Sequence, residues 1–209
     1  MVSNTSSGQA QTLKAQIEGK IQALLKEFAD GKLNREQFNV LYERYSGQLA
    51  VAQQAIAGGS PAALAQTRDG GQSTIAIRQE HMGKAIGLVI YQNRTGVSIE
   101  TLGDFDVSAF VISPVLNDFT RMMESQRLIE HRTIELDDRR WLLFAGGRFT
   151  TVVTLFHNEP SPLQVREIMR LHNDFEIANA LLLEKGGHPD GQKMAYPFIV
   201  FVQQKLKKP

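Results

Sequence analysis

The N-terminal part of the chain carries two blocks of apolar residues at helical spacing. In the first block, apolar residues recur every three or four positions over residues 13–28, which places them on one helix face. Asp30-Gly31 ends this helix, because glycine tolerates the left-handed conformation of a helix C-cap. Asn34 is the expected N-cap of the next helix, with Gln37 as its capping-box partner. The pattern therefore predicts two helices joined by a short turn.

The second helical block has the spacing of a heptad seam, which is typical of a coiled coil. Its apolar members are Phe38, Tyr42, Tyr45, Leu49, Ala52 and Ile56. Two amphipathic helices with a short connection form an antiparallel hairpin, expected over residues 12–57. Such a hairpin buries little surface, so it packs on the rest of the chain or on another copy. We expect Phe38, Tyr42, Tyr45 and Leu49 to be the contact residues of this helical arm.

The segments around the hairpin lack a strong apolar pattern. Residues 1–11 are rich in Ser, Gln and Asn and are predicted to be disordered. Residues 58–74 are rich in Ala, Gly, Gln and Ser and are predicted to be a linker. Ile75 and Ile77 alternate with polar residues, which predicts a short strand over residues 73–78.

Residues 75–186 are expected to form one α/β domain. Residues 85–91 form an almost wholly apolar run, typical of a central strand, and residues 97–101 form its partner strand. Ser113-Pro114 interrupts the next helical pattern, so a helix either begins there, with Ser113 as N-cap and Pro114 in its first turn, or is kinked there. We favour a helix over residues 114–126, with a looser helical turn before it.

Three strand patterns and a long helix follow. Residues 128–136, 141–145 and 149–156 predict an antiparallel meander. Ser161 and Pro162 then mark the start of a helix. We predict an α+β fold: a five-stranded antiparallel sheet with helices packed on it, preceded by the N-terminal hairpin. Residues 187–209 are expected to be a C-terminal tail, with a short helix or edge strand over residues 196–208.

Composition and charge exclude several classes of function. The chain of 209 residues is 42% hydrophobic, and its 23 basic and 22 acidic residues give a net charge of +1. This balance argues against a nucleic-acid partner. The absence of cysteine excludes disulfides and thiol chemistry. With no signal-peptide pattern and no apolar run of about 18 residues, we expect no membrane span and a cytoplasmic protein.

Catalytic motifs are also absent from the sequence. The five histidines do not follow a metal-ligand spacing. The two glycine-rich phosphate-binding motifs, GxxxxGK(S/T) and GxGxxG, do not occur. His157 and Glu159 are the best-placed pair, since residues two apart in a strand share a face, but a solvated loop explains them more simply. We therefore expect no catalytic, metal-binding or cofactor-binding residues, and no enzyme activity.

The order of elements in the α/β part resembles the roadblock / dynein light chain family of the profilin-like group. The resemblance is carried by the strand at 86–91 with its Thr95-Gly96 turn, by the Asp137-Asp138 hairpin, and by the strand at 149–156 leading into the last helix. It covers about half of the chain. The sequence departs from the family by having the hairpin in place of the usual helix before the first strand, and by its C-terminal tail.

The resemblance implies a dimer without catalytic activity. Members of the family bind or regulate partners, often small Ras-like GTPases or motor complexes. Their dimer contact would correspond here to Val115, Phe119, Met122, Met123, Ile129 and Ile134. We therefore expect a homodimeric scaffold or regulatory module that binds a protein, such as a small GTPase. The alternative is a small-molecule sensor of the PAS or GAF type, which predicts a pocket between sheet and helix.

Overall fold

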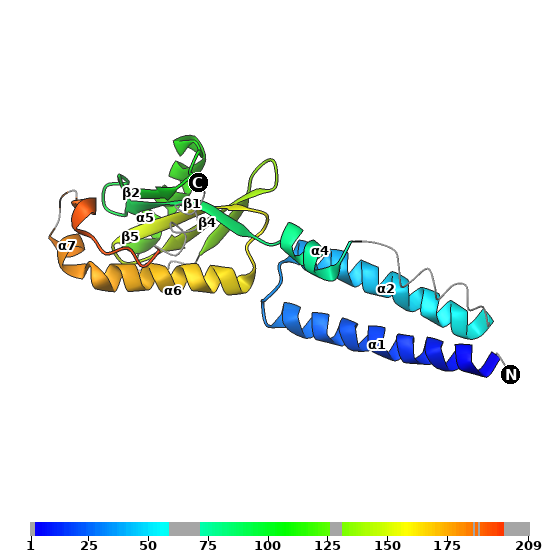
Figure 1. Ribbon diagram of the computed structural model, residues 1–209. Helices are drawn as coiled ribbons and strands as arrows, with labels where there is room; N and C mark the ends of the chain where they lie inside the picture. Colours follow the sequence, from blue (N-terminus) through cyan, green and yellow to red (C-terminus); the bar gives the residue numbers. More distant parts are fainter. Residues whose placement is uncertain (1–2, 59–71, 126–130, 186, 188, 199–209) are drawn as a thin grey trace, which may run out of the picture. The chain divides into compact units, whose positions relative to one another are not determined.

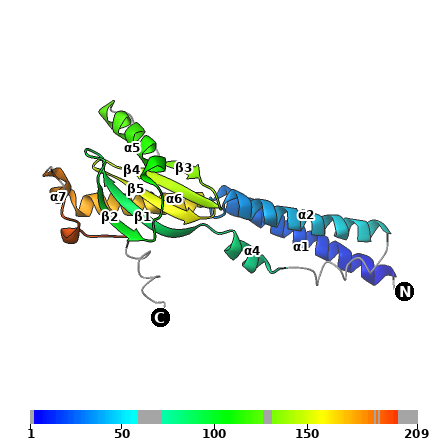
Figure 2. The same ribbon diagram turned by 90° about the horizontal axis from the view of Figure 1, so that it is seen from above.

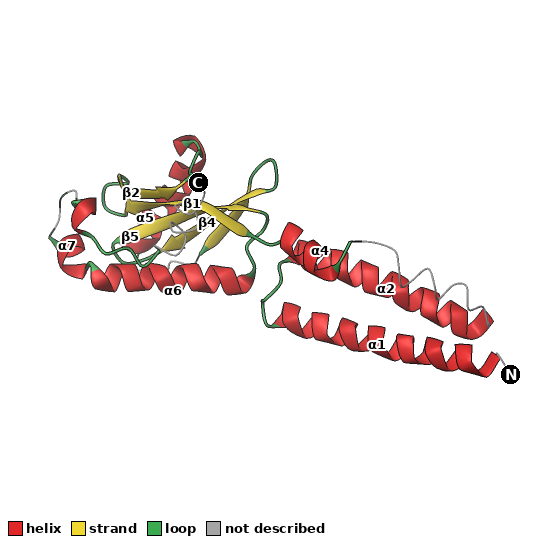
Figure 3. Ribbon diagram, in the orientation of Figure 1, coloured by secondary structure: helices red, strands yellow, loops and turns green. Residues whose placement is uncertain are grey.

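The computed structural model describes residues 3–58, 72–125, 131–185, 187 and 189–198. It confirms the predicted α+β class, with a five-stranded antiparallel sheet and two N-terminal helices (Figures 1 and 3). The chain divides into two compact units. The helical unit consists of residues 1–82 and 161–163, and the α/β unit of residues 83–160 and 164–209.

The helical unit is the predicted hairpin with one additional short helix. Its helices are α1 (Ser3–Ala29), α2 (Arg35–Gly58) and α4 (Thr74–Glu80). Gly31 has a φ of 74°, as expected for the C-cap of α1. The capping box is confirmed: the Gln37 N–H donates to Asn34 Oδ1 at 2.8 Å, and the Asn34 N–H donates to Gln37 Oε1 at 3.1 Å. These two bonds satisfy backbone donors that the start of α2 would otherwise leave without partners.

Two predictions for the hairpin are wrong. Helix α1 begins at Ser3, so residues 3–11 are helical and not disordered. Ala10 is 1% exposed, and a buried alanine gives no visible apolar period. The buried seam of α2 is also rotated, because Leu41 is fully buried whereas Tyr42 is 42% exposed. Leu41 and Tyr42 each fit an apolar pattern that repeats every three or four residues along α2. The smaller leucine side chain is the one that packs between the two helices.

The prediction of a strand at 73–78 is also wrong, because these residues lie in α4 and its N-cap. The Ser73 side chain accepts a hydrogen bond from the Ala76 N–H at 3.1 Å. The last turn of α4 is bound by α2: Asn34 Nδ2 donates to the His81 carbonyl and Gln37 Nε2 donates to the Arg78 carbonyl, both at 2.7 Å. These donors satisfy carbonyl groups that a helix C-terminus exposes, so the segment is stable as a helix.

The sheet of the α/β unit has the strand order β2-β1-β5-β4-β3, and all neighbouring strands are antiparallel. The strands are β1 (Lys84–Gln92), β2 (Ser98–Gly103), β3 (Arg132–Glu135), β4 (Arg140–Gly146) and β5 (Thr150–His157). The helices are α5 (Ala109–Glu124), α6 (Pro162–Ala178), α7 (Ala180–Glu184) and the 3-10 helix η1 (Gly191–Lys193). The predicted meander therefore forms β3, β4 and β5, and the long helix starts at Pro162 as expected.

Helices cover both faces of this sheet. Helix α6 lies along one face, as Figure 1 and the view from above in Figure 2 show. Its buried side chains pack on Leu88, Leu143, Val152 and Phe156. Helix α5 covers the opposite face, where Ile112, Val115 and Phe119 pack on Leu142, Phe144, Val153 and Leu155. Alternate residues of β4 and β5 point to opposite faces, so both strands are buried on both sides.

Helix α5 starts earlier than predicted. It begins at Ala109 and contains Pro114, while the Ser108 hydroxyl caps it by accepting from the Phe110 N–H at 3.3 Å. Proline removes the hydrogen bond to the carbonyl four residues earlier, which belongs to Phe110. Phe110 is 88% exposed, so water can satisfy that carbonyl and the helix continues through Pro114.

The C-terminal segment as far as Phe198 is part of the α/β core, and not the separate tail that the sequence predicts. Met194 and Phe198 are buried against the α6 side of the sheet. Asn179 anchors this segment, because its side chain donates to the Ala195 carbonyl at 2.8 Å and accepts from the Ala195 N–H at 2.9 Å. The predicted linker at 59–71, the start of the predicted strand at 128–136 and the predicted element beyond Phe198 lie outside the described residues.

Candidate functional site

The residues predicted for a dimer contact on the sheet side are mainly core residues. Val115 and Phe119 are 5% and 2% exposed and pack on β4 and β5 of their own chain, so they are not available to a partner. Met122, Met123 and Ile134 are half-buried. Ile129 lies outside the described residues.

The residues predicted for the helical arm divide between the interior and the surface. Tyr45 is buried in the seam between α1 and α2, and Leu49 is half-buried beside it. Phe38 and Tyr42 lie in a row of stacked aromatic rings that begins at Phe28. The ring centroids are 4.4 Å apart for Phe28 and Phe38, and 5.4 Å apart for Phe38 and Tyr42.

This row belongs to an apolar surface that we call the aromatic patch: Leu25, Phe28, Phe38 and Tyr42. Leu25 and Tyr42 are 40% and 42% exposed, and the two phenylalanines are half-buried. Offset-stacked rings are a favourable arrangement, so the patch keeps a fixed shape. The sequence pattern placed Phe38 and Tyr42 in the heptad seam, and both were predicted to be contact residues of the arm. The prediction did not include Leu25 or Phe28 among the contact residues.

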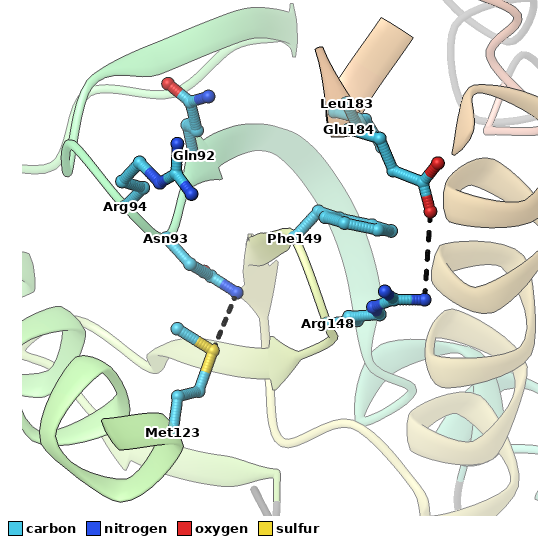
Figure 4. Close-up of a pocket in the computed structure, with 8 residues that line it drawn as sticks. All are labelled: Gln92, Asn93, Arg94, Met123, Arg148, Phe149, Leu183 and Glu184. Carbon is cyan, nitrogen blue, oxygen red and sulfur yellow. Dashed lines mark hydrogen bonds and ion pairs between the residues drawn. The ribbon is translucent and has the colours of Figure 1, made fainter. Parts of the chain in front are cut away.

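A second candidate site is a cavity of about 410 Å³ in the α/β unit (Figure 4). It lies at the end of the sheet where the β1–β2 and β4–β5 turns come together. The described residues that line it are Gln92, Asn93, Arg94, Met123, Arg148, Phe149, Leu183 and Glu184. The two turns are neighbours because Gln92 pairs with Thr150 across β1 and β5.

Asn93 joins the two turns that form this cavity. Its backbone N–H donates to the Phe149 carbonyl, and its Nδ2 donates to the Gly147 carbonyl, both at 2.9 Å. Its Oδ1 accepts from the Thr151 hydroxyl at 2.7 Å. Every polar atom of this side chain is therefore used within the protein, which identifies Asn93 as a structural residue of the cavity wall.

Glu176 of α6 fixes the β4–β5 turn from the other side. Its carboxylate accepts hydrogen bonds from the backbone N–H groups of Arg148, Phe149 and Thr150 at 2.8 to 2.9 Å. Carboxylates that accept several backbone N–H bonds form strong contacts. A Cβ atom at Gly147 would lie 2.6 Å from this carboxylate, so a side chain there would displace Glu176 from its hydrogen bonds.

A buried histidine completes the network behind the turn. The Thr150 hydroxyl donates to Glu176 Oε1 at 2.8 Å, so it accepts from His172 Nε2, also at 2.8 Å. Burial lowers the pKa of His172 below its ordinary value, and the nearby Glu176 carboxylate opposes this effect. The imidazole is therefore held neutral, with its proton on Nε2, and supports the turn.

In the part of the chain that the structure describes, the other groups with shifted pKa values do not gather into a catalytic cluster. Burial, with contributions from Glu100 and Asp190, raises the pKa of Tyr196 to about 12. The Tyr196 hydroxyl donates to the Gly191 carbonyl at 2.7 Å, which explains it as a structural group. His157, the best-placed histidine in the sequence, is exposed at the end of β5.

The described residues contain neither a metal-binding cluster nor a membrane-spanning helix. Within that part of the chain, no group of three or more His, Cys, Asp or Glu residues is arranged to hold a metal ion. Among the helices described, none combines the length and the apolar character needed to cross a membrane.

The sequence contained a signal for the cavity that was not used. Each of the two turns has an arginine, Arg94 after Asn93 and Arg148 after Gly146-Gly147. Only the strand order, with β5 beside β1, brings the two arginines to the same end of the sheet. Likewise, His172 and Glu176 are four residues apart on α6, a spacing that places both on one helix face.

Known proteins give no further guide to this chain. Comparisons with models of protein families, with curated proteins and with solved structures found no match.

Proposed function

We propose that the protein is a non-enzymatic homodimeric scaffold or regulatory module, in which the helical arm contacts a second copy of the chain. The observation that carries this proposal is the aromatic patch on the helical unit. The protein partner that such a dimer binds is a small Ras-like GTPase, which is what the resemblance to the roadblock family implies.

The size of the arm supports self-association. At about 1.5 Å per residue, helices of 27 and 24 residues are about 36 to 40 Å long. Along that length, the described core of the unit is one apolar cluster built from α1, α2 and the turn between them, with Ile77 of α4 as a further member. A second hairpin packed on the aromatic patch would add the missing layer, as in a four-helix bundle.

The residue types of the patch also support a protein contact. Tyrosine and other aromatic side chains supply much of the binding energy at protein interfaces. Leu25 and Tyr42 would lose their remaining water contact when a second copy packs on them, which contributes to the hydrophobic driving force.

The α/β unit supports the alternative of a PAS or GAF sensor less well. That alternative predicts a ligand pocket between the sheet and a helix. In the described residues, packed apolar side chains fill both of these layers. The cavity of about 410 Å³ lies at the end of the sheet instead.

Sedimentation velocity of the full chain over a range of concentrations tests the proposal. We expect a dimer that the Tyr42→Glu substitution weakens by about tenfold or more, since it places a charge in an apolar contact. Glu43→Gln changes the adjacent exposed residue of α2 and is the matched control. Circular dichroism checks that each variant retains its helices.

Two results would contradict the arm contact: a monomer at every concentration, or a dimer that Tyr42→Glu leaves unchanged. The GTPase partner is tested separately with a purified Ras-like GTPase from the same organism, loaded with GDP or a non-hydrolysable GTP analogue. Saturable binding that depends on the nucleotide is expected, and the absence of binding in both states would reject this class of partner.

A further inference from the structure

We propose that the cavity at the end of the sheet binds a small organic anion, whose carboxylate or phosphate group is bound by Arg94 and Arg148. This site lies entirely within the α/β unit. The proposal does not depend on the dimer or on a GTPase partner.

The charges that line the cavity favour an anion. Two arginines and one glutamate contribute to the lining. Arg94 makes no hydrogen bond or ion pair with any residue that the structure describes. The Arg148 Nη1 atom lies 3.8 Å from Glu184 Oε1, which is too long for a hydrogen bond. Both guanidinium groups therefore retain donors for a carboxylate or phosphate, which they bind well in a two-pronged geometry.

The two amide side chains of the wall already have hydrogen-bond partners within the chain. Both polar atoms of the Asn93 side chain are bonded within the chain. Gln92 Nε2 donates to the Gly187 carbonyl, and Gln92 Oε1 accepts from the Thr95 hydroxyl, both at 2.8 Å. Recognition of a polar ligand therefore falls mainly on the two arginines, which select negative charge.

Met123, Phe149 and Leu183 add apolar surface to different parts of the cavity wall (Figure 4). The Arg148 guanidinium lies over the Phe149 ring, with its Cζ atom 4.7 Å from the ring centroid. This cation–π contact restricts the arginine to one side of the ring. Figure 4 shows Arg94 on a different wall from the pair formed by Arg148 and Glu184. A ligand with an anionic group and an apolar or aromatic body would match these surroundings.

The site is preorganised by hydrogen bonds within its lining and from Glu176 behind it. Glu176 fixes the backbone of Arg148 and Phe149, and Asn93 connects this turn to the one that carries Arg94. A rigid base lowers the conformational entropy that binding would otherwise cost. The volume of about 410 Å³ is in the range of small-molecule sites, which run from roughly 300 to 1,000 Å³.

Isothermal titration calorimetry of the full chain tests the site with three probes of similar shape. Phenyl phosphate and benzoate carry the two anionic groups, and benzyl alcohol is the neutral control. We expect at least one of the two anions to bind with one-to-one stoichiometry, whereas benzyl alcohol does not bind at the same concentration. The tighter of the two anions identifies the preferred group.

Substitutions then locate the binding. Arg94→Gln and Arg148→Gln should each lower the affinity for the anion by about tenfold or more, because each substitution removes a charge-assisted contact. Arg139→Gln is the matched control, since Arg139 is exposed in the β3–β4 turn, at the opposite end of the sheet. It should leave the affinity unchanged. Arg94→Gln removes no contact within the described chain, so the melting temperature of this variant should equal that of the unaltered protein.

The proposal would be overturned by any of three results. These are the absence of binding by both anions at millimolar concentration, equal binding of benzyl alcohol, and an affinity that neither Arg94→Gln nor Arg148→Gln reduces.

Discussion

The two units of the protein bury their apolar side chains in different ways. In the α/β unit, β4 and β5 lie between two helical layers, and both faces of the sheet have a packed cluster. In the helical unit, α1 and α2 share one seam, and apolar side chains remain exposed beside it. An element covered on both faces has little apolar surface left for a partner, whereas a two-helix layer has much of one face still available.

This difference leads us to expect separate roles for the two units. The α/β unit can hold a rigid cavity, because partly buried hydrogen bonds fix the turns that form it. The helical unit has the exposed aromatic surface that a second copy can cover. We therefore expect substitutions in the sheet to affect folding, and substitutions on the arm surface to affect association.

The largest expected effect is on the sheet. Phe144 is fully buried in β4 and makes an edge-to-face contact with Phe119. Phe144→Ala should cost about 3 to 5 kcal/mol of unfolding free energy, because it leaves a cavity in the core. Urea unfolding followed by the fluorescence of Trp141, the single tryptophan, reports on this unit.

Phe110→Ala is the control for this substitution. Phe110 is 88% exposed, so its removal should change the unfolding free energy by about 0.5 kcal/mol or less. Equal effects of the two substitutions would show that the sheet is not packed on both faces as described.

A smaller effect is expected in the hairpin. Leu41 is fully buried in the seam, and Leu41→Ala should destabilise the helical unit by about 2 to 3 kcal/mol. Loss of helical circular dichroism in urea, at a protein concentration below that needed for association, measures this change. The urea midpoint measured by Trp141 fluorescence should not change, because Trp141 lies in the other unit.

Leu25→Ala is the matched control, since it is the same substitution at a position that is 40% exposed on α1. It should cost less than about 1 kcal/mol. A larger cost for Leu25→Ala than for Leu41→Ala would mean that the seam runs through the other face of the hairpin.

The smallest expected effect is a dependence of stability on pH. Burial lowers the pKa of His172 in the folded protein, while the unfolded chain keeps the ordinary value of about 6.5. Below that pH the unfolded chain binds a proton that the folded chain does not, so stability falls as the pH falls. The loss of stability between about pH 7 and about pH 5.5 is at most about 1.3 kcal/mol, the limit reached when the folded chain binds no proton in that range.

His172→Gln should flatten this part of the stability curve measured by urea unfolding at several pH values. His157→Gln, at an exposed position of β5, should leave the slope as it is. An unchanged slope in His172→Gln would show that the buried histidine does not titrate as its surroundings imply.

The sequence predicted the elements whose signals are local. The Asn34–Gln37 capping box, the glycine at the end of α1 and the proline at the start of α6 each act within one helical turn. The apolar runs of β1, β4 and β5 are typical of strands covered on both faces, and the structure confirms their antiparallel sheet. Local chemistry was therefore enough for the fold class.

Features that depend on distant residues were missed. Helix α4 is held by side chains of α2 that precede it by about forty residues, and Asn179 binds the segment that was predicted to be a tail. Leu41 is buried between α1 and α2 whereas Tyr42 stays exposed, and this depends on how the two helices pack together. The cavity requires the strand order, because its two arginines are more than fifty residues apart.

The native mass of the unaltered chain tests the central claim most directly. The helical arm, with its exposed aromatic patch, predicts that the purified protein has twice the chain mass of 23.3 kDa. A native mass spectrum at micromolar concentration and above gives this value without any substitution. A spectrum that contains only the 23.3 kDa monomer at every concentration would contradict the homodimeric scaffold.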